Sequence, residues 1–329
     1  MTISIGRRTV LRAIGLGVAA PTAVSGLAAA DTGPRTLFTY NPGAGELPEN
    51  VAIDHRGTKY VSFAPRGEIR AISPDNQTET TVATLNVGTG NGVIGLEVTP
   101  DGTLYACLAS FDTPGSDTHG IWTVPPGGSP RLFAALPTDR FPNDILLAGD
   151  SLLVTDTIGG AVLHVSEGEW REWVSDPLLL GNGTAGFPFP LGANGIAEAA
   201  DGTVYVANTE RGTLVEIPVD PDGSAGTPTP FSSDSALGFV DGLAIDTRDN
   251  LYAAIIGQNT VLRVTPAGVV ETLATAADGL DGPSDVTFGT SRGEQKSVFI
   301  TNFALLNPTN PAPSLMQLDV GVPGRPIHP

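Results

Sequence analysis

Residues 192–209, GANGIAEAADGTVYVANT, decide the fold, because they read as two short strands joined by a tight turn. The first strand starts at Gly195, directly after Asn194. Asp201-Gly202 predicts the turn, since tight hairpin turns need backbone angles that Gly tolerates and Asp accommodates. Residues 203–207 alternate β-branched or aromatic side chains with small ones, as strands do. One hairpin decides little, but this one recurs along the chain.

Five other stretches repeat the pattern. They are PENVAIDHRGTKYVS at 48–62, VIGLEVTPDGTLYACL at 93–108, FPNDILLAGDSLLVTDT at 141–157, VDGLAIDTRDNLYAA at 240–254 and GPSDVTFGTSRGEQKSVFITN at 282–302. We call the residue at the start of each first strand a mouth residue, and the six are Glu49, Ile94, Asn143, Asn194, Asp241 and Ser284. Their spacing of 43–51 residues, with several short strands per unit, is typical of propeller blades.

The remaining two strands of each blade can also be located. Third strands are predicted at 67–73, 120–125, 161–166, 212–218, 260–265 and 314–320, and fourth strands at 79–85, 131–136, 171–176, 227–233 and 270–275. The last blade has no fourth strand of its own, and RTLFTY at 35–40 fits that place. We therefore predict an all-β, six-bladed β-propeller whose N-terminal strand closes the last blade, which leaves no open seam. A β-sandwich or a parallel β-helix would also show regular short strands, but neither explains this borrowed strand.

Residues 1–30 have the features of an export signal. Arg7 and Arg8 precede an apolar run at 13–29, and the stretch ends in three alanines before Asp31. This pattern resembles a twin-arginine signal peptide with a small-residue cleavage site. We expect residues 31–329 to form the propeller domain, exported to the cell surface, the periplasm or the medium. The alternative is an uncleaved N-terminal anchor.

The charge balance is strongly acidic. The chain has 35 acidic against 17 basic residues, a formal net charge of −18. Such a charge argues against nucleic acid and anionic membranes as partners. It fits either adaptation to high salt, where screening weakens self-repulsion, or the ordinary acidity of an exported protein. Cys107 is the only cysteine, so no intrachain disulfide can form, and its place in a predicted second strand indicates a buried side chain.

The mouth residues could form a metal site. In a propeller the first strands line the central tunnel, so Glu49, Asn143, Asn194 and Asp241 should converge at one end of it. Two carboxylates and two amide oxygens are hard ligands that suit Ca²⁺, although another divalent ion could also bind. The alternative is that these side chains merely cap turns between blades.

Several of these motifs resemble those of the regucalcin/gluconolactonase (senescence marker protein) family. The resemblance rests on PENVAID, FPNDI, GANGIAEAADGTVYVANT and VDGLAIDTRDNLYAA and extends over residues 35–320. It implies a six-bladed calcium propeller, related to paraoxonases and diisopropyl-fluorophosphatases, whose catalytic metal is held by Glu49, Asn143, Asn194 and Asp241. It also implies that Asp241 is the general base or nucleophile in lactone or phosphoester hydrolysis. The Arg-rich substrate loop of gluconolactonases is missing from residues 107–120, which argues against a sugar lactone.

Three further features concern the pocket. His119 is placed on a loop at the metal face and could assist proton transfer, although a solvated loop histidine is the simpler interpretation. The loops at 181–192 and 303–313 carry apolar residues that could cover a hydrophobic small-molecule substrate or pack on each other. The sequence thus predicts a calcium-dependent hydrolase of a lactone or related ester. The alternative is a non-catalytic NHL-like scaffold with a structural calcium.

Overall fold

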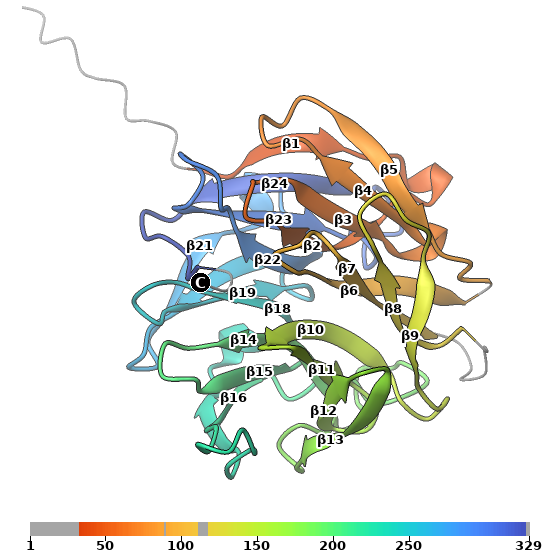
Figure 1. Ribbon diagram of the computed structural model, residues 1–329. Coiled ribbons are helices and arrows are strands. Elements are labelled where there is room, and N and C mark those ends of the chain that lie inside the picture. The colour runs from red at the N-terminus through yellow and green to blue at the C-terminus, as the bar shows by residue number, and fades with distance from the viewer. Residues whose placement is uncertain (1–32, 89, 111–117, 327–329) are drawn as a thin grey trace, which may run out of the picture. The chain divides into compact units, whose positions relative to one another are not determined.

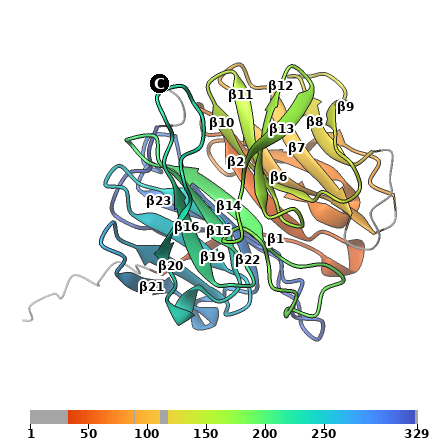
Figure 2. The same ribbon diagram turned by 90° about the horizontal axis from the view of Figure 1, so that it is seen from below.

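The computed structural model describes residues 33–88, 90–110 and 118–326, all within the unit 33–329. Residues 1–30, for which an export signal is predicted, lie outside this range. The described chain forms six four-stranded sheets arranged as a β-propeller, which confirms the predicted fold. Figures 1 and 2 show the chain passing from sheet to sheet around the ring, so that the last, blue sheet lies beside the first, orange one. No described helix is long and apolar enough to cross a membrane.

Each blade consists of consecutive antiparallel strands, and the bounds lie within two residues of those predicted for the outer strands. Blades 1 to 3 are β2(Pro48–Ile53), β3(Lys59–Phe63), β4(Glu68–Ile72), β5(Glu79–Thr84); β6(Asn91–Val98), β7(Leu104–Ser110), β8(Gly120–Val124), β9(Arg131–Ala135); and β10(Pro142–Ala148), β11(Ser151–Asp156), β12(Ala161–Ser166), β13(Glu169–Ser175). Blades 4 and 5 are β14(Ala193–Glu198), β15(Val204–Asn208), β16(Thr213–Ile217), β17(Thr229–Ser232); and β18(Val240–Ile245), β19(Leu251–Ile255), β20(Thr260–Val264), β21(Val270–Ala274).

Blade 6 joins the two ends of the chain. It contains β22(Pro283–Phe288), β23(Ser297–Asn302) and β24(Ser314–Asp319), followed by β1(Arg35–Thr39) as its outer strand. β1 pairs antiparallel with β24, and the Arg35 guanidinium donates through Nε and Nη2 to Gln317 Oε1 at 3.1 and 2.5 Å. The predicted ring closure is therefore confirmed.

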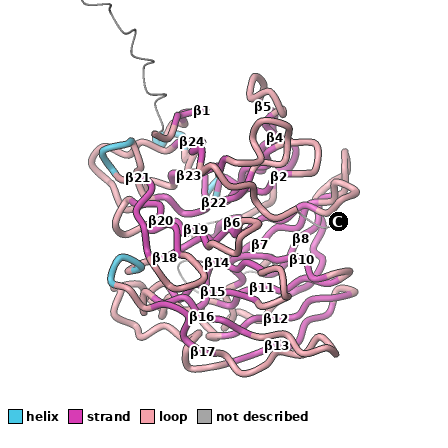
Figure 3. The backbone as a smooth tube through the Cα atoms, turned by 90° about the vertical axis from the view of Figure 1, so that its left-hand side faces the viewer, coloured by secondary structure: helices cyan, strands magenta, loops and turns pink. Residues whose placement is uncertain are grey.

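The loops carry short helical turns, drawn in cyan in Figure 3. Within the described residues they are η1(Pro42–Ala44), η2(Ala64–Arg66), η3(Ser235–Leu237) and η4(Ala276–Asp278). The turn at Asp201-Gly202 has the predicted geometry, since Gly202 has a positive φ of 88° and the Asp201 carboxylate accepts from the Thr203 N–H at 3.0 Å. Such turns place the ends of the first strands on the face opposite the mouth residues.

Burial falls from the tunnel outward. The first strand β2 is buried along its whole length, whereas most residues of the outer strand β5 are exposed. Apolar side chains of neighbouring blades form the core between them. Aromatic side chains also meet across this boundary, as in the edge-to-face pair Tyr252–Phe288, whose ring centroids lie 5.0 Å apart. Cys107 is fully buried, as predicted. Because the first strands are held on both sides, the side chains at their starts are fixed with little freedom.

Candidate metal centre

A β-bulge marks the same place in all six blades. The pairing of the first and second strands shifts register between Pro48 and Val51, Val93 and Leu96, Pro142 and Ile145, Ala193 and Ile196, Val240 and Leu243, and Pro283 and Asp285. Each of these six intervals contains a mouth residue, which therefore lies inside its first strand rather than before it. Bulges bend a strand and redirect side chains next to functional sites.

The four predicted ligands line one cavity of about 80 Å³. Glu49, Asn143, Asn194 and Asp241 come from blades 1, 3, 4 and 5, and each is only 7–9% exposed. The remaining polar lining residue is Thr209. Nine apolar residues, which we call the apolar wall, complete the lining: Ile94, Phe141, Phe187, Leu191, Phe239, Ile256, Phe303, Leu305 and Leu306. The structure thus brings the predicted residues together, although the described residues contain no metal-binding group of three His, Cys, Asp or Glu.

Two threonines orient the asparagine amides. Asn143 Nδ2 donates to Thr157 Oγ1 and Asn194 Nδ2 donates to Thr209 Oγ1, both at 3.0 Å. Thr157 in turn donates to the Ala193 carbonyl at 2.7 Å, which fixes the direction of its lone pairs. The Asn194 side chain also hydrogen-bonds to the Asp241 carboxylate. Because the NH₂ groups make these bonds, the amide oxygens remain available as acceptors or ligands. Sequence reasoning missed these threonines, although both directly follow a second strand.

The sixth mouth residue, Ser284, supports the backbone of the site. Ser284 does not line the cavity, and its hydroxyl donates to the Glu49 carbonyl oxygen at 2.6 Å. The Thr301 hydroxyl donates to the same oxygen at 2.8 Å. Blade 6 therefore fixes the backbone of Glu49 in blade 1 across the seam of the ring.

A second ring of polar groups lies one residue further along the first strands. Asn50 Oδ1 accepts from the Leu96 N–H at 3.1 Å, Asp144 Oδ2 from Ile196 at 3.1 Å, and Asp285 Oδ2 from Val51 at 3.0 Å. Each bond joins a blade to its neighbour. Blades 2, 4 and 5 have glycine at this position, and a Cβ on Gly95 would lie 2.0 Å from the Asn143 carbonyl oxygen. The ring therefore ties the blades together directly beneath the site.

The carboxylates of the tunnel interact strongly. Burial, together with the charges of Asp241, Asp285 and Asp144, holds the pKa of Glu49 well above its usual range. Burial raises the pKa of Asp241 to about 8 and that of Asp144 to about 6. No Lys or Arg within the described residues forms an ion pair with Glu49 or Asp241. An unneutralised group of buried carboxylates attracts a cation, whose charge would offset their repulsion.

His119 is placed differently from expectation. It directly precedes β8 and is 2% exposed, so the interpretation as a solvated loop histidine is wrong. It is not among the residues that line the cavity, and its imidazole faces the backbone of Arg140 instead. Burial lowers the pKa of its imidazole, which favours the neutral form. Its predicted role in proton transfer therefore stays a prediction without geometric support.

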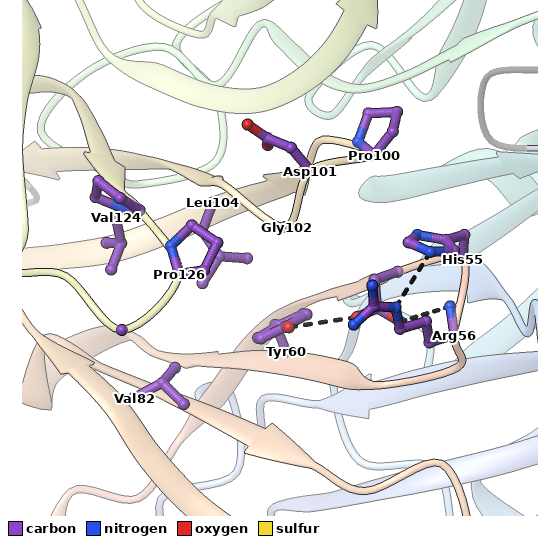
Figure 4. Close-up of a pocket in the computed structure, with 13 residues that line it drawn as sticks. His55, Arg56, Tyr60, Val82, Pro100, Asp101, Gly102, Leu104, Val124 and Pro126 are labelled. Atoms are coloured by element: carbon purple, nitrogen blue, oxygen red, sulfur yellow. Dashed lines mark hydrogen bonds between the residues drawn. The ribbon is translucent and has the colours of Figure 1, made fainter.

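Other cavities lie away from the predicted residues. Figure 4 shows one of about 240 Å³ between turns of blades 1 and 2, at the strand ends opposite the mouth residues. There Arg56 Nε donates to His55 Nε2 at 3.3 Å, and the Tyr60 hydroxyl donates to Asp54 Oδ2 at 3.4 Å. Four of its polar side chains are thus bonded in two pairs, and no predicted site residue lines it.

Comparison with known proteins gives one family match. Residues 191–303, which include Asn194 and Asp241, match the model of the SMP-30/gluconolactonase/LRE-like region. This segment is similar to that family, and it makes up about a third of the chain. The family resemblance predicted from the sequence is therefore confirmed, while no curated protein matches the sequence.

Solved structures extend the likeness of fold beyond the SMP-30/gluconolactonase-like segment. A gluconolactonase from Xanthomonas campestris is 17% identical with a TM-score of 0.61, covering 89% of this chain and 95% of its own. The calcium-binding protein regucalcin from Agrobacterium tumefaciens is 18% identical with a TM-score of 0.63, at the same coverage. A streptogramin B lyase is 13% identical with a TM-score of 0.59, covering 87% of this chain and 96% of its own. The shared fold alone therefore does not decide the chemistry.

Proposed function

We propose that this protein is an exported, calcium-dependent hydrolase that acts on a lactone or a related ester. The observation that carries the proposal is the meeting of Glu49, Asn143, Asn194 and Asp241 in one cavity, each from the same bulge of a different blade. Their four oxygen donors match the preference of Ca²⁺ for carboxylate and amide oxygens. The match to the SMP-30/gluconolactonase/LRE-like region supports the same class of reaction.

The residues present fit a calcium ion. Glu49 and Asp241 would supply two negative charges, and the amide oxygens of Asn143 and Asn194 would add ligands without further repulsion. The bonds from the two amides to Thr157 and Thr209 already hold the amide groups in the orientation that such binding needs. When bound, Ca²⁺ would supply Lewis acidity toward a carbonyl oxygen.

Other roles in the reaction would belong to side chains of the protein. Asp241 carries a carboxylate that is 7% exposed and lines the cavity, so it can take a proton from water or attack the carbonyl directly. Ser284 and Thr301 fix the backbone of Glu49, and therefore act as positioning residues. The apolar wall limits the access of water to the reacting group.

Hydrolysis assays with and without a calcium chelator test this function. Purified protein would be given γ-lactones, aryl esters and phosphotriesters in 1 mM CaCl₂ or in excess EGTA, with calcium binding measured by titration calorimetry. We expect turnover of a lactone or ester that EGTA abolishes. Asp241→Asn should lower kcat by about 100-fold or more, whereas Asp150→Asn, an exposed aspartate in a turn, should leave kcat unchanged. Wild-type turnover in Asp241→Asn, or no calcium binding at millimolar concentration, would contradict the proposal.

Export rests on Arg7, Arg8 and the apolar run that follows. Replacing both arginines with lysine should retain the protein in the cytoplasm, since the twin-arginine pair is the recognised feature. Cell fractionation with an antibody to the propeller measures this. An unchanged distribution between cells and medium would contradict the export route without affecting the hydrolase proposal.

A further inference from the structure

The apolar wall dominates the cavity above the four oxygen donors. Beyond those donors and Thr209, every lining residue is aliphatic or aromatic, and no Lys, Arg or His lines the cavity in the described structure. The apolar residues come from positions at which other blades have polar residues. Ile94 occupies in blade 2 the place that the ligands occupy elsewhere, and Ile256 and Phe303 follow the second strands of blades 5 and 6, where blades 3 and 4 have threonine.

Two buried or partly buried carboxylates hold the loops of the wall in place. Glu210 accepts from the N–H groups of Gly183 and Ala185 at 2.6 and 2.9 Å, in the loop that carries Phe187. Asp281, 8% exposed, accepts through Oδ2 from Asn307 Nδ2 at 3.1 Å and from the Ala312 N–H at 2.8 Å. The conformation of each loop is therefore held by hydrogen bonds to a carboxylate, and not only by packing of its apolar side chains.

One residue of the apolar wall, Phe239, has a strained backbone conformation. Phe239 has a φ of 63°, a conformation that a bulky residue rarely adopts. Its N–H donates to the Thr209 carbonyl at 3.2 Å, and its carbonyl accepts from the Ile256 N–H at 3.2 Å. A Cβ on Gly257 would lie 2.7 Å from Phe239 Cβ, so glycine leaves room for the ring. Such strain persists only where the surrounding structure holds it, and it clusters at functional sites. Here it places the Phe239 side chain against the cavity.

The size and exposure of the wall show where a ligand would extend. The cavity of about 80 Å³ is smaller than the roughly 150 Å³ of an engineered cavity that holds benzene. Only the reacting group of a substrate would fit within it. Phe187, Leu305 and Leu306 are 37, 42 and 49% exposed at its edge, and apolar side chains gathered at the edge of a polar site mark a place for ligand contact.

We propose that the substrate carries an alkyl or aryl group that lies along Phe187, Leu305 and Leu306 while its ester or lactone group enters the cavity. This inference rests on the proposed function and narrows it to neutral, apolar lactones or esters. A sugar lactone would leave several hydroxyl groups against the apolar wall without partners, and each unsatisfied polar group opposes binding. A charged substituent would find no basic side chain among the lining residues that the structure describes.

A series of γ-lactones tests the inference through turnover. For the full chain in calcium, kcat/KM should rise from γ-butyrolactone to γ-dodecalactone by up to about fourfold per methylene, and D-glucono-δ-lactone should be the poorest substrate. Leu305→Asn/Leu306→Asn should lower the dodecalactone-to-butyrolactone ratio at least tenfold. Val269→Asn is the matched control, since Val269 is 60% exposed in a turn at the opposite strand ends and should leave the ratio unchanged. Equal kcat/KM along the series, or preference for gluconolactone, would overturn the inference but not the hydrolase proposal.

Binding of N-phenyl-1-naphthylamine, a neutral fluorescent probe, decides the inference even without turnover. γ-Dodecalactone should displace the probe from the wild-type protein at a concentration at least tenfold lower than γ-butyrolactone. The difference should shrink in Leu305→Asn/Leu306→Asn and persist in Val269→Asn. Displacement with no hydrolysis of any lactone or ester would support the apolar site while rejecting the hydrolase. Equal displacement by both lactones, or no binding of the probe, would overturn the inference.

Discussion

Thr209 Oγ1 accepts a hydrogen bond from Asn194 Nδ2 at 3.0 Å, and Thr157 does the same for Asn143 in the neighbouring blade. Both amides are 8–9% exposed and both face the cavity. The same arrangement in two blades is what turns a pair of asparagines into a pair of oriented oxygen donors, because an unanchored amide could present its NH₂ end to a cation.

Removing both hydroxyl groups should therefore weaken calcium binding while keeping the shape of the side chains. Thr157→Val/Thr209→Val should raise the Kd for calcium by about 10- to 100-fold, in the range found when outer partners of metal ligands are lost. Titration calorimetry measures this, and Thr272→Val, an exposed threonine of β21, serves as the control. An unchanged Kd in the double variant would show that calcium binding does not depend on the hydrogen bonds between the threonines and the amides.

Ring closure by β1 makes a second prediction. Leu37, Phe38 and Tyr40 pack against the buried cluster at the seam, and the Tyr40 ring lies 4.8 Å from that of Phe63. A chain that starts at Pro42 loses this strand, whereas a chain that starts at Pro34 keeps it. We expect the Tm of the shorter chain to be lower by about 5 °C, from about 3 kcal/mol of lost burial. Equal Tm values in calorimetric scans would mean that β1 contributes little to the stability of the ring.

Much of the architecture could be predicted from the sequence because its determinants are local. Tight hairpin turns, such as Asp101-Gly102 and Asp201-Gly202, and the period of 43–51 residues located the blades. Because no fourth strand follows 314–320, residues 35–40 were needed to close the ring. The mouth residues could be matched because each stands at the same distance from a turn. Their place inside a bulge could not be predicted, since a bulge depends on the partner strand.

The surroundings of the site were harder to predict, because they depend on contacts between blades. Asp144 accepts from the Ile196 N–H of the next blade, and nothing in the sequence near Asp144 says which backbone its carboxylate will reach. The same holds for Glu210 and Asp281, which hold loops far from them in sequence. His119 precedes a strand as predicted, but its burial comes from tertiary packing that local sequence does not reveal.

The net charge of −18 leads to a prediction about salt. If the surplus of acidic residues is an adaptation to high salt, screening of their repulsion should raise the Tm as KCl increases from 0.1 M into the molar range. The measurement is best made at saturating calcium, so that ion competition at the site does not contribute. A Tm that is flat or falls over this range would favour the ordinary acidity of an exported protein instead.

The buried carboxylates of the site make the effect of calcium depend on pH. Burial raises the pKa of Asp241 from its usual 3.8 to about 8, and that of Glu49 is also raised. In the metal-free protein the contribution of these groups to stability is therefore present at low pH, and it is lost as the pH rises through about 8. Calcium needs the deprotonated carboxylates, so its binding releases protons and becomes stronger over the same range.

The increase in Tm on adding calcium should consequently be larger at pH 8.5 than at pH 5.5. With calcium at 100 times its Kd at pH 8.5, binding adds about 2.7 kcal/mol, which corresponds to an increase of about 4 °C. At pH 5.5 the same calcium concentration should raise the Tm by no more than about 2 °C. Glu49→Gln/Asp241→Asn should abolish the difference between the two pH values, while Asp150→Asn should retain it. An equal increase at both pH values in the wild-type protein would show that these two carboxylates do not bind the ion.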